Sequence, residues 1–139
     1  MQISPLLLLI FFSLNLFAQP ASKDCQGLHN GKFYYYPVGK HDLYIITRND
    51  TLQMEVEFAS HDTSWWKASW PEPCTLSVNL IDDTKVMPLQ QKEFMRKYAT
   101  MIHITQLKQA YYIFDASFIN GGKEFGKMTD TMWLQPKRK

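Results

Sequence analysis

The chain has 139 residues, a formal net charge of +2 at neutral pH and 14% aromatic residues. Acidic and basic residues are nearly balanced, and the basic run at residues 136–139 is typical of a solvated tail, which argues against a nucleic-acid partner. The histidines are scattered and form no metal-binding motif, so we expect no metal and no cofactor.

Residues 1–18 predict a secretory signal peptide. They hold an uncharged apolar run at residues 5–12, and the small residue Ala18 stands at the expected cleavage site, although the usual basic residue before the run is missing. The run is shorter than the ~20 residues of a membrane-spanning helix, so we expect cleavage rather than a membrane anchor. The predicted product is a single secreted or periplasmic β domain, residues 19–139, with no membrane span.

The two cysteines, Cys25 and Cys74, both belong to the predicted mature domain. An oxidising compartment favours a disulfide between them. In the chain-entropy model, closing a loop of about 50 residues stabilises the folded state by ~4 kcal/mol. A reactive thiol or a metal pair is the weaker interpretation, because no neighbouring residue offers ligand spacing.

Strand-like runs at residues 42–48 and 51–58 predict the first clear hairpin. Asn49-Asp50 separates the two runs, and both residue types tolerate the positive φ of a two-residue turn. Pairing across that turn sets Ile45 opposite Met54. The hairpin then has one apolar face and one largely polar face, which fixes its expected register.

A tryptophan-rich stretch that ends at Cys74 predicts the second hairpin. With residues 71–73 as a three-residue loop, Trp70 lies across from Cys74. Trp66 and Trp70 then point inward, and Trp65 points outward.

The second half of the chain is less regular. Residues 88–98 contain good helix formers after Pro88 and predict a short helix, with an irregular strand and loop as the alternative. A third hairpin is expected around residues 108–109, with Tyr112 and Phe114 on one face. Ile104 is then expected on the opposite face.

The complete pattern is all-β, with about eight short strands joined by tight turns at nearly regular spacing. This is typical of an antiparallel meander that closes into a small barrel or a two-layer sandwich. The outline also looks like the lipocalin-type architecture, whose members often hold a small ligand inside the barrel.

Three stretches carry a resemblance to a family of small exported proteins from Bacteroidetes-type bacteria. They are Cys25-Gln26-Gly27 with Gly31-Lys32-Phe33, residues 44–50 with Gln53 and Glu55, and Trp70 shortly before residues 74–78. The chain departs from the family at Leu76, where an aromatic residue is common, and at residues 108–109, where a Gly-Asp turn is common. The resemblance implies export but no established function. Members are sometimes labelled DNA topoisomerase IV, which this chain's size, its export signal and the lack of a phosphate-binding loop exclude.

The aromatic residues are the remaining functional candidates. Trp66, Trp70, Tyr112 and Phe114 are predicted to point inward and to line any cavity for a small apolar or amphipathic ligand. Trp65 and Tyr111 are predicted on outer faces, where they would serve recognition of an extracellular protein or glycan.

Three functional hypotheses follow from these placements. The first is non-catalytic ligand binding inside the barrel, and the alternative is an interaction protein that uses an exposed aromatic patch. A hydrolase is the third, but no catalytic residue is marked and no Gly-x-Ser-x-Gly motif is present. Two titratable groups that converge in a cleft would favour it.

Overall fold

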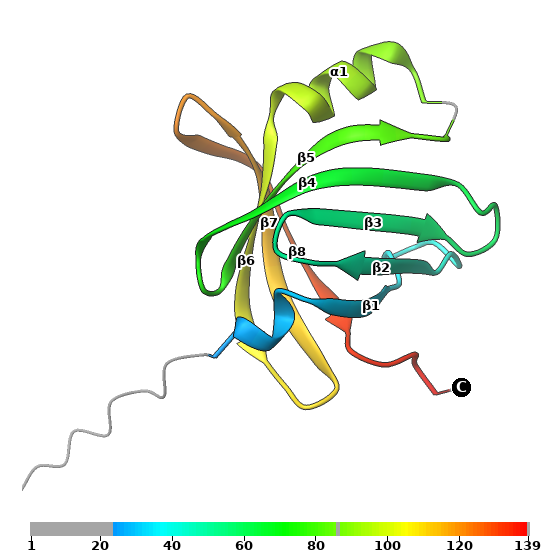
Figure 1. Cartoon of the computed structure of the whole chain (residues 1–139), viewed down its shortest axis with the longest axis vertical. Coiled ribbons are helices and arrows are strands. Elements are labelled where there is room, and N and C mark those ends of the chain that lie inside the picture. The colour runs from blue at the N-terminus through cyan, green and yellow to red at the C-terminus, as the bar shows by residue number, and fades with distance from the viewer. Residues whose placement is uncertain (1–23, 86, 139) are drawn as a thin grey trace, which may run out of the picture.

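The computed structural model describes residues 24–85 and 87–138 and forms a closed antiparallel β-barrel (Figure 1). Each of its eight strands pairs with the next one along the chain, and β8 pairs back with β1. The predicted all-β meander is therefore confirmed, in its lipocalin-like barrel form rather than as a sandwich. The predicted signal peptide at residues 1–18 lies outside the described residues.

The elements follow one another in the order η1, β1 to β5, α1, β6 to β8. Their bounds are η1 (Gln26–Leu28), β1 (Gly31–Tyr35), β2 (Tyr44–Arg48), β3 (Leu52–Glu57), β4 (Thr63–Glu72), β5 (Thr75–Asp83), α1 (Leu89–Lys97), β6 (Ala99–Leu107), β7 (Tyr111–Asn120) and β8 (Lys123–Trp133). The helix expected at residues 88–98 is confirmed as α1. It lies beyond the edge of β5 at one end of the barrel (Figure 1).

The β2–β3 hairpin differs from the predicted register by two residues. Ile45 pairs with Val56 rather than with Met54. The turn residues do not adopt positive φ; instead, the Asn49 side-chain oxygen accepts hydrogen bonds from the backbone N–H groups of Thr51 (3.0 Å) and Leu52 (2.8 Å). This side-chain cap moves the turn one residue along the chain. A shift of two keeps every side chain on its predicted face.

The polar face of this hairpin is the one that points into the barrel. Ile46, Arg48 and Gln53 are buried, whereas Ile45 and Met54 on the other face are only half-buried. Inward-facing polar groups must find partners inside the barrel, because buried polar groups without partners are costly. The inward-facing polar side chains of this hairpin therefore need hydrogen-bond partners inside the barrel.

The β4–β5 hairpin also differs from its predicted register. Trp66 pairs with Leu80 rather than with Val78, and the turn residues are Pro73 and Cys74 instead of a three-residue loop. A register shift between Ser69 and Glu72 accommodates the intervening proline, which has no N–H for the ladder. Trp66 nevertheless keeps its predicted inward face.

The β6–β7 hairpin corrects a third expectation. Ile104 pairs directly with Phe114, so both side chains lie on the same face and both belong to the main core cluster. The opposite face predicted for Ile104 is wrong. The cause is a bulge between Ile104 and Gln106, which adds one residue to β6 and changes the register by one.

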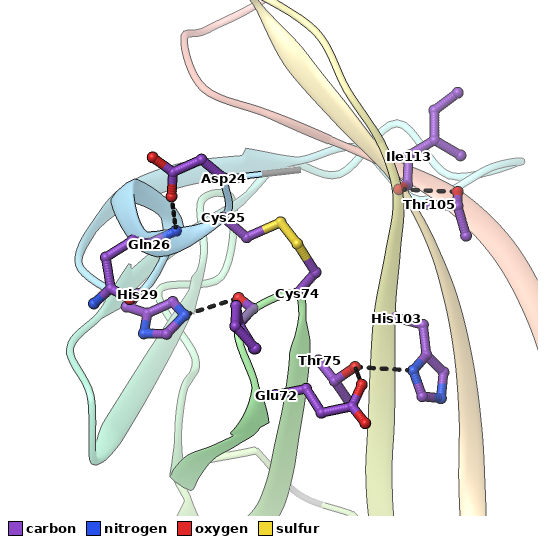
Figure 2. Close-up of a disulfide and its surroundings, with 11 residues drawn as sticks. Asp24, Cys25, Gln26, His29, Glu72, Cys74, Thr75, His103, Thr105 and Ile113 are labelled. Atoms are coloured by element: carbon purple, nitrogen blue, oxygen red, sulfur yellow. Dashed lines mark hydrogen bonds between the residues drawn. A yellow bond between two sulfur atoms is a disulfide. The ribbon is translucent and has the colours of Figure 1, made fainter. Parts of the chain in front are cut away.

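One end of the barrel is closed by the N-terminal segment; we call it the disulfide end. The predicted bridge between Cys25 and Cys74 is present and joins η1 to the β4–β5 turn (Figure 2). His29 stacks on Trp70 with 3.7 Å between the ring centroids, and its Nε2 donates to the Pro73 carbonyl at 2.9 Å. These contacts fix η1 across the barrel end.

Candidate functional site

The opposite end of the barrel holds a cavity; we call it the helix end, because α1 forms part of the cavity wall. The cavity has a volume of about 370 Å³. Its lining comes from the β1–β2 and β3–β4 connections, the inner faces of β2 to β5, and the segment that leads into α1. The lining residues are Lys40, Tyr44, Glu55, Glu57, Asp62, Thr63, Ser64, Trp66, Asp83, Lys85, Met87, Pro88, Gln91 and Met95.

One wall of the cavity is a paired polar cluster built around Glu57. The Glu57 carboxylate lies 3.2 Å from the Lys85 ammonium, and it accepts hydrogen bonds from the hydroxyls of Tyr44 (3.2 Å) and Ser60 (2.7 Å). The Ser60 hydrogen bond, followed by the contacts with Lys85, lowers the pKa of Glu57 below its usual range. Burial acts to lower the pKa of Lys85, but Glu57 and Tyr44 outweigh it and raise that pKa. Both groups are therefore charged at neutral pH and satisfy each other.

Glu55 lies one inward position further along β3, between Glu57 at the cavity and the buried Gln53. Its Oε1 accepts a hydrogen bond from the Gln53 amide at 2.7 Å. Burial raises the pKa of Glu55, although the Gln53 hydrogen bond and the charge of Arg48 act in the opposite direction. Neighbouring groups therefore compensate only part of the cost of burying the negative charge of Glu55.

The other charged residues of the lining are distributed between wall and rim. Asp83 forms an ion pair with Lys92 of α1, with 2.6 Å between Nζ and Oδ1, and this contact ties the helix to the end of β5. The side chains of Asp62 and Lys40 form no ion pair within the described residues. The lining holds four carboxylates, Glu55, Glu57, Asp62 and Asp83, against two ammonium groups.

The apolar part of the lining is centred on Trp66. One side of this residue packs against the buried cluster formed by Ala68, Leu76 and Val78, and its indole N–H donates to the Ser64 hydroxyl at 2.9 Å. The methionines at positions 87 and 95 complete the apolar surface from the α1 side. The cavity is thus amphipathic, with charged groups from β3, β5 and the connections between strands, and apolar groups from β4 and the α1 segment.

Of the four residues expected to line a cavity, Trp66 lies in the lining and the other three do not. Tyr112 and Phe114 are 1% and 5% exposed and belong to the main core cluster, against which Trp70 packs. The barrel is therefore filled with rings toward the disulfide end, and the helix-end cavity lies beyond them. Ligand contact by Trp70, Tyr112 and Phe114 stays a prediction.

The two residues predicted for surface recognition lie on the outer face of the barrel, and both are half-buried. Tyr111 stands beside Trp133 of β8, with 5.1 Å between ring centroids, whereas Trp65 pairs with Met54 of β3. Their strands are not neighbours, so they do not form one compact patch. Recognition by either residue stays a prediction.

The sequence also contained residues that we did not single out as candidates, above all Glu55, Glu57 and Tyr44. Their signal was the strict alternation in β3, where Gln53, Glu55 and Glu57 share one face with apolar residues between them. Alternation of this kind predicts a strand with one polar face, and a polar face normally meets solvent. In a barrel the same pattern can line an interior cavity, and here it does.

The third hypothesis, a hydrolase, gains titratable groups that converge in a cleft, and the Ser60 hydroxyl donates to Glu57 there at 2.7 Å, but the lowered pKa of Glu57 makes this carboxylate a weak general base. The Ser64 hydroxyl accepts the indole N–H of Trp66, and the Thr63 hydroxyl donates to the His61 carbonyl. Neither hydroxyl is paired with a general base, which acyl transfer through a serine or threonine requires. Within residues 24–85 and 87–138, no three His, Cys, Asp or Glu side chains are grouped to hold a metal ion.

Comparison with protein-family models, with curated proteins and with solved structures found no match to this chain. A search of the described residues for a helix long and apolar enough to cross a membrane also found none. The function must therefore be argued from the geometry of the cavity itself.

Proposed function

We propose that the protein is a non-catalytic binding protein that holds a small amphipathic ligand in the helix-end cavity. The cavity carries this proposal, because its 370 Å³ fall within the size range of small-molecule sites. The disulfide between Cys25 and Cys74 supports a location outside the cytoplasm, because such bonds persist in oxidising compartments.

The composition of the cavity wall favours an amphipathic ligand over a purely apolar one. A fully apolar molecule would bury charged groups such as Glu55 without offering them partners, and that desolvation is costly. A ligand with one polar end and one apolar end would satisfy both walls, with its apolar part against Trp66.

The test is native mass spectrometry of the protein purified from its own host, with a matched pair of variants. Gln91 lines the cavity, whereas its neighbour Gln90 is an exposed residue of the same helix that does not. We expect a co-purified small molecule on the wild type and on Gln90→Trp, and its loss from Gln91→Trp, where the new indole fills the cavity. A bound molecule retained by Gln91→Trp would place binding elsewhere and refute the proposal.

A second candidate is recognition of a protein or glycan, and the apolar outer face favours it. Half-buried apolar side chains on the outer faces of β7, β8, β1, β2, β3 and β4 form a belt: Tyr111, Trp133, Tyr34, Ile45, Val56, Met54 and Trp65. Aromatic rings on a sheet face are a common recognition surface. Under this candidate, Trp133→Ala would abolish binding in an oligosaccharide panel measured by surface plasmon resonance, whereas Gln91→Trp would not change it.

A further inference from the structure

The Glu55 carboxylate of the cavity wall has no ion-pair partner among the described residues, whereas Glu57 and Asp83 of the same wall are paired with Lys85 and Lys92. Its Oε1 accepts from Gln53 at 2.7 Å, and no hydrogen bond or ion pair to its Oε2 is formed by any residue that the structure describes. An ionised carboxylate has about four acceptor sites. Glu55 therefore retains unused acceptor capacity at a position that faces the cavity.

The nearest counter-charge reaches Glu55 only through an intermediary. Arg48 Nε donates to the Gln53 side-chain oxygen at 2.7 Å, and the Gln53 amide in turn donates to Glu55. The remaining Arg48 contacts are directed at the disulfide end, to the Leu28 carbonyl (3.3 Å) and the Tyr112 hydroxyl (3.4 Å). The Arg48 charge is thus shared among several acceptors and does not neutralise Glu55 directly.

The Tyr35 phenol, which the charge of Glu55 reaches, brings no positive charge to this carboxylate. On the β1 side, the Tyr35 hydroxyl donates to Asp130 of β8 at 2.7 Å. Burial raises the pKa of Tyr35, and the charges of Asp130 and Glu55 raise it further, so both carboxylates lie near this phenol. Of the four carboxylates in the cavity lining, Glu57 is paired with Lys85 and Asp83 with Lys92, so Glu55 and Asp62 are left without an ion pair among the described residues.

The aromatic wall suits a positive charge as well. Tyr44 already holds the Lys85 ammonium 5.8 Å from its ring centroid, which shows that a cation is accommodated in this wall. The Trp66 ring makes no stacking or cation–π contact with the described residues. The part of this ring that lines the cavity is therefore available to the apolar part of a ligand whose charge lies nearby.

We propose that the ligand of the helix-end cavity is an amphipathic organic amine, whose ammonium group pairs with Glu55 and whose apolar part lies against Trp66. This inference rests on the proposed function and names the ligand class for the same cavity. The acidic lining residues are not grouped to hold a metal ion within the described residues, which favours an organic cation. An anionic ligand is disfavoured because Lys85 is engaged with Glu57 and Lys40 is exposed at the rim.

The test compares three small probes of similar shape on the intact protein by isothermal titration calorimetry at neutral pH. They are 2-phenylethylamine, which is cationic, 2-phenylethanol, which is neutral, and 3-phenylpropionate, which is anionic. We expect the amine to bind at least tenfold more tightly than the alcohol, the usual scale of a charge-assisted hydrogen bond. We expect no measurable binding of the carboxylate.

The matched variants are Glu55→Gln and Glu93→Gln. Glu93 is an exposed carboxylate of α1 outside the cavity lining, so its loss changes the net charge equally without changing the cavity. We expect Glu55→Gln to remove the preference for the amine and Glu93→Gln to preserve it. The ranking of the probes on the wild type tests the inference even where the Glu55 variant does not fold.

The outcomes separate this inference from the proposed function. Equal binding of amine and alcohol, or tighter binding of the carboxylate, refutes the amine inference and leaves the ligand-binding function standing. An unchanged amine preference in Glu55→Gln also refutes the inference. If no probe binds and no molecule co-purifies with the protein from its host, both the function and the inference fail.

Discussion

The two ends of this barrel use the same strands in opposite ways. At the disulfide end, Arg48 and Gln53 are 3% and 2% exposed, and each side chain is hydrogen-bonded to protein partners. At the helix end, inward positions further along the same two strands, Tyr44 and Glu57, face a cavity of about 370 Å³. The Arg48 and Gln53 side chains are therefore buried and hydrogen-bonded at the disulfide end, although the buried Trp70 indole N–H there has no partner among the described residues, whereas the helix end is open and charged.

The difference between the two ends separates polar residues that stabilise the fold from polar residues that are candidates for function. A buried polar group with all its partners inside the protein serves the fold, because removing any partner leaves another group unsatisfied. A polar group with spare bonding capacity beside a cavity is a candidate contact for a ligand. Arg48 is of the first kind, and Glu55, only one hydrogen-bonded residue away, is of the second.

The largest effect is expected at the disulfide. Replacing both Cys25 and Cys74 with alanine opens a loop with a sequence separation of 49 residues. The chain-entropy model predicts that the free energy of unfolding falls by ~4 kcal/mol, measured by urea denaturation.

The same variant tests whether the two ends are independent. Under conditions in which it stays folded, we expect the helix-end cavity to bind its probes with unchanged affinity, because its lining lies at the opposite end of the barrel from the bridge. A parallel loss of affinity would show that the ends are coupled. An unchanged free energy of unfolding would show that η1 does not contribute to the stability of the closed end.

The second largest loss of stability is expected from replacing Arg48, whose guanidinium is buried at the disulfide end. Arg48→Ala removes hydrogen bonds to Gln53, Leu28 and Tyr112 and the packing of the side chain over Phe33, 4.8 Å from that ring centroid. We expect a loss of about 3 kcal/mol in the free energy of unfolding, from unsatisfied partners and a new cavity together.

Two further variants separate the causes of that loss. Arg48→Met keeps most of the packing volume of the side chain but none of its hydrogen bonds. If this variant is nearly as stable as the wild type, the loss in Arg48→Ala is due to packing. If it is as unstable as Arg48→Ala, the loss is due to the hydrogen bonds. Arg96→Ala is the matched control, because Arg96 is an exposed residue of α1 with one distant ion-pair contact to Asp82 at 3.6 Å. A loss as large for Arg96 as for Arg48 would contradict the interpretation that the buried Arg48 side chain stabilises the disulfide end.

The sequence was sufficient for the fold class and for the closure of one end. Alternating strands and turn residues predicted the meander, and two cysteines in a predicted exported domain were enough to pair Cys25 with Cys74. The registers were not predictable to the residue, since they depend on local events. A side-chain cap at Asn49 and a bulge after Ile104 each changed the pairing, and neither is visible in apolar periodicity.

The cavity escaped the sequence analysis for a related reason. We expected aromatic rings to mark the ligand site. In a small barrel, however, most inward-facing rings pack into the hydrophobic core, as Tyr112 and Phe114 do. The informative residues were the inward polar ones on β3. Periodicity shows that Glu55 and Glu57 share a face, but only barrel closure decides that this face is the interior.

The smallest effect, and the one that most sharpens the contrast between the ends, is the stability of Glu55→Gln. Burial raises the pKa of Glu55 in the folded state, so the folded protein holds that proton more tightly than the unfolded chain does. Ionisation of Glu55 at a pH above its raised pKa therefore costs folding free energy, and this cost disappears as the pH falls through that pKa. Glutamine is neutral throughout and can still accept the hydrogen bond from Gln53.

We therefore expect Glu55→Gln to be more stable than the wild type at pH 7 by roughly 1 kcal/mol, the scale of a buried polar group without full compensation. The difference should shrink toward zero as the pH falls, in parallel urea titrations of both proteins, while the exposed control Glu93→Gln should stay within about 0.5 kcal/mol of the wild type at pH 7. A variant less stable than the wild type at pH 7 would mean that Arg48 already compensates Glu55 through Gln53. In that case Glu55 would belong to the disulfide end of the barrel, and its carboxylate would not be available to a ligand.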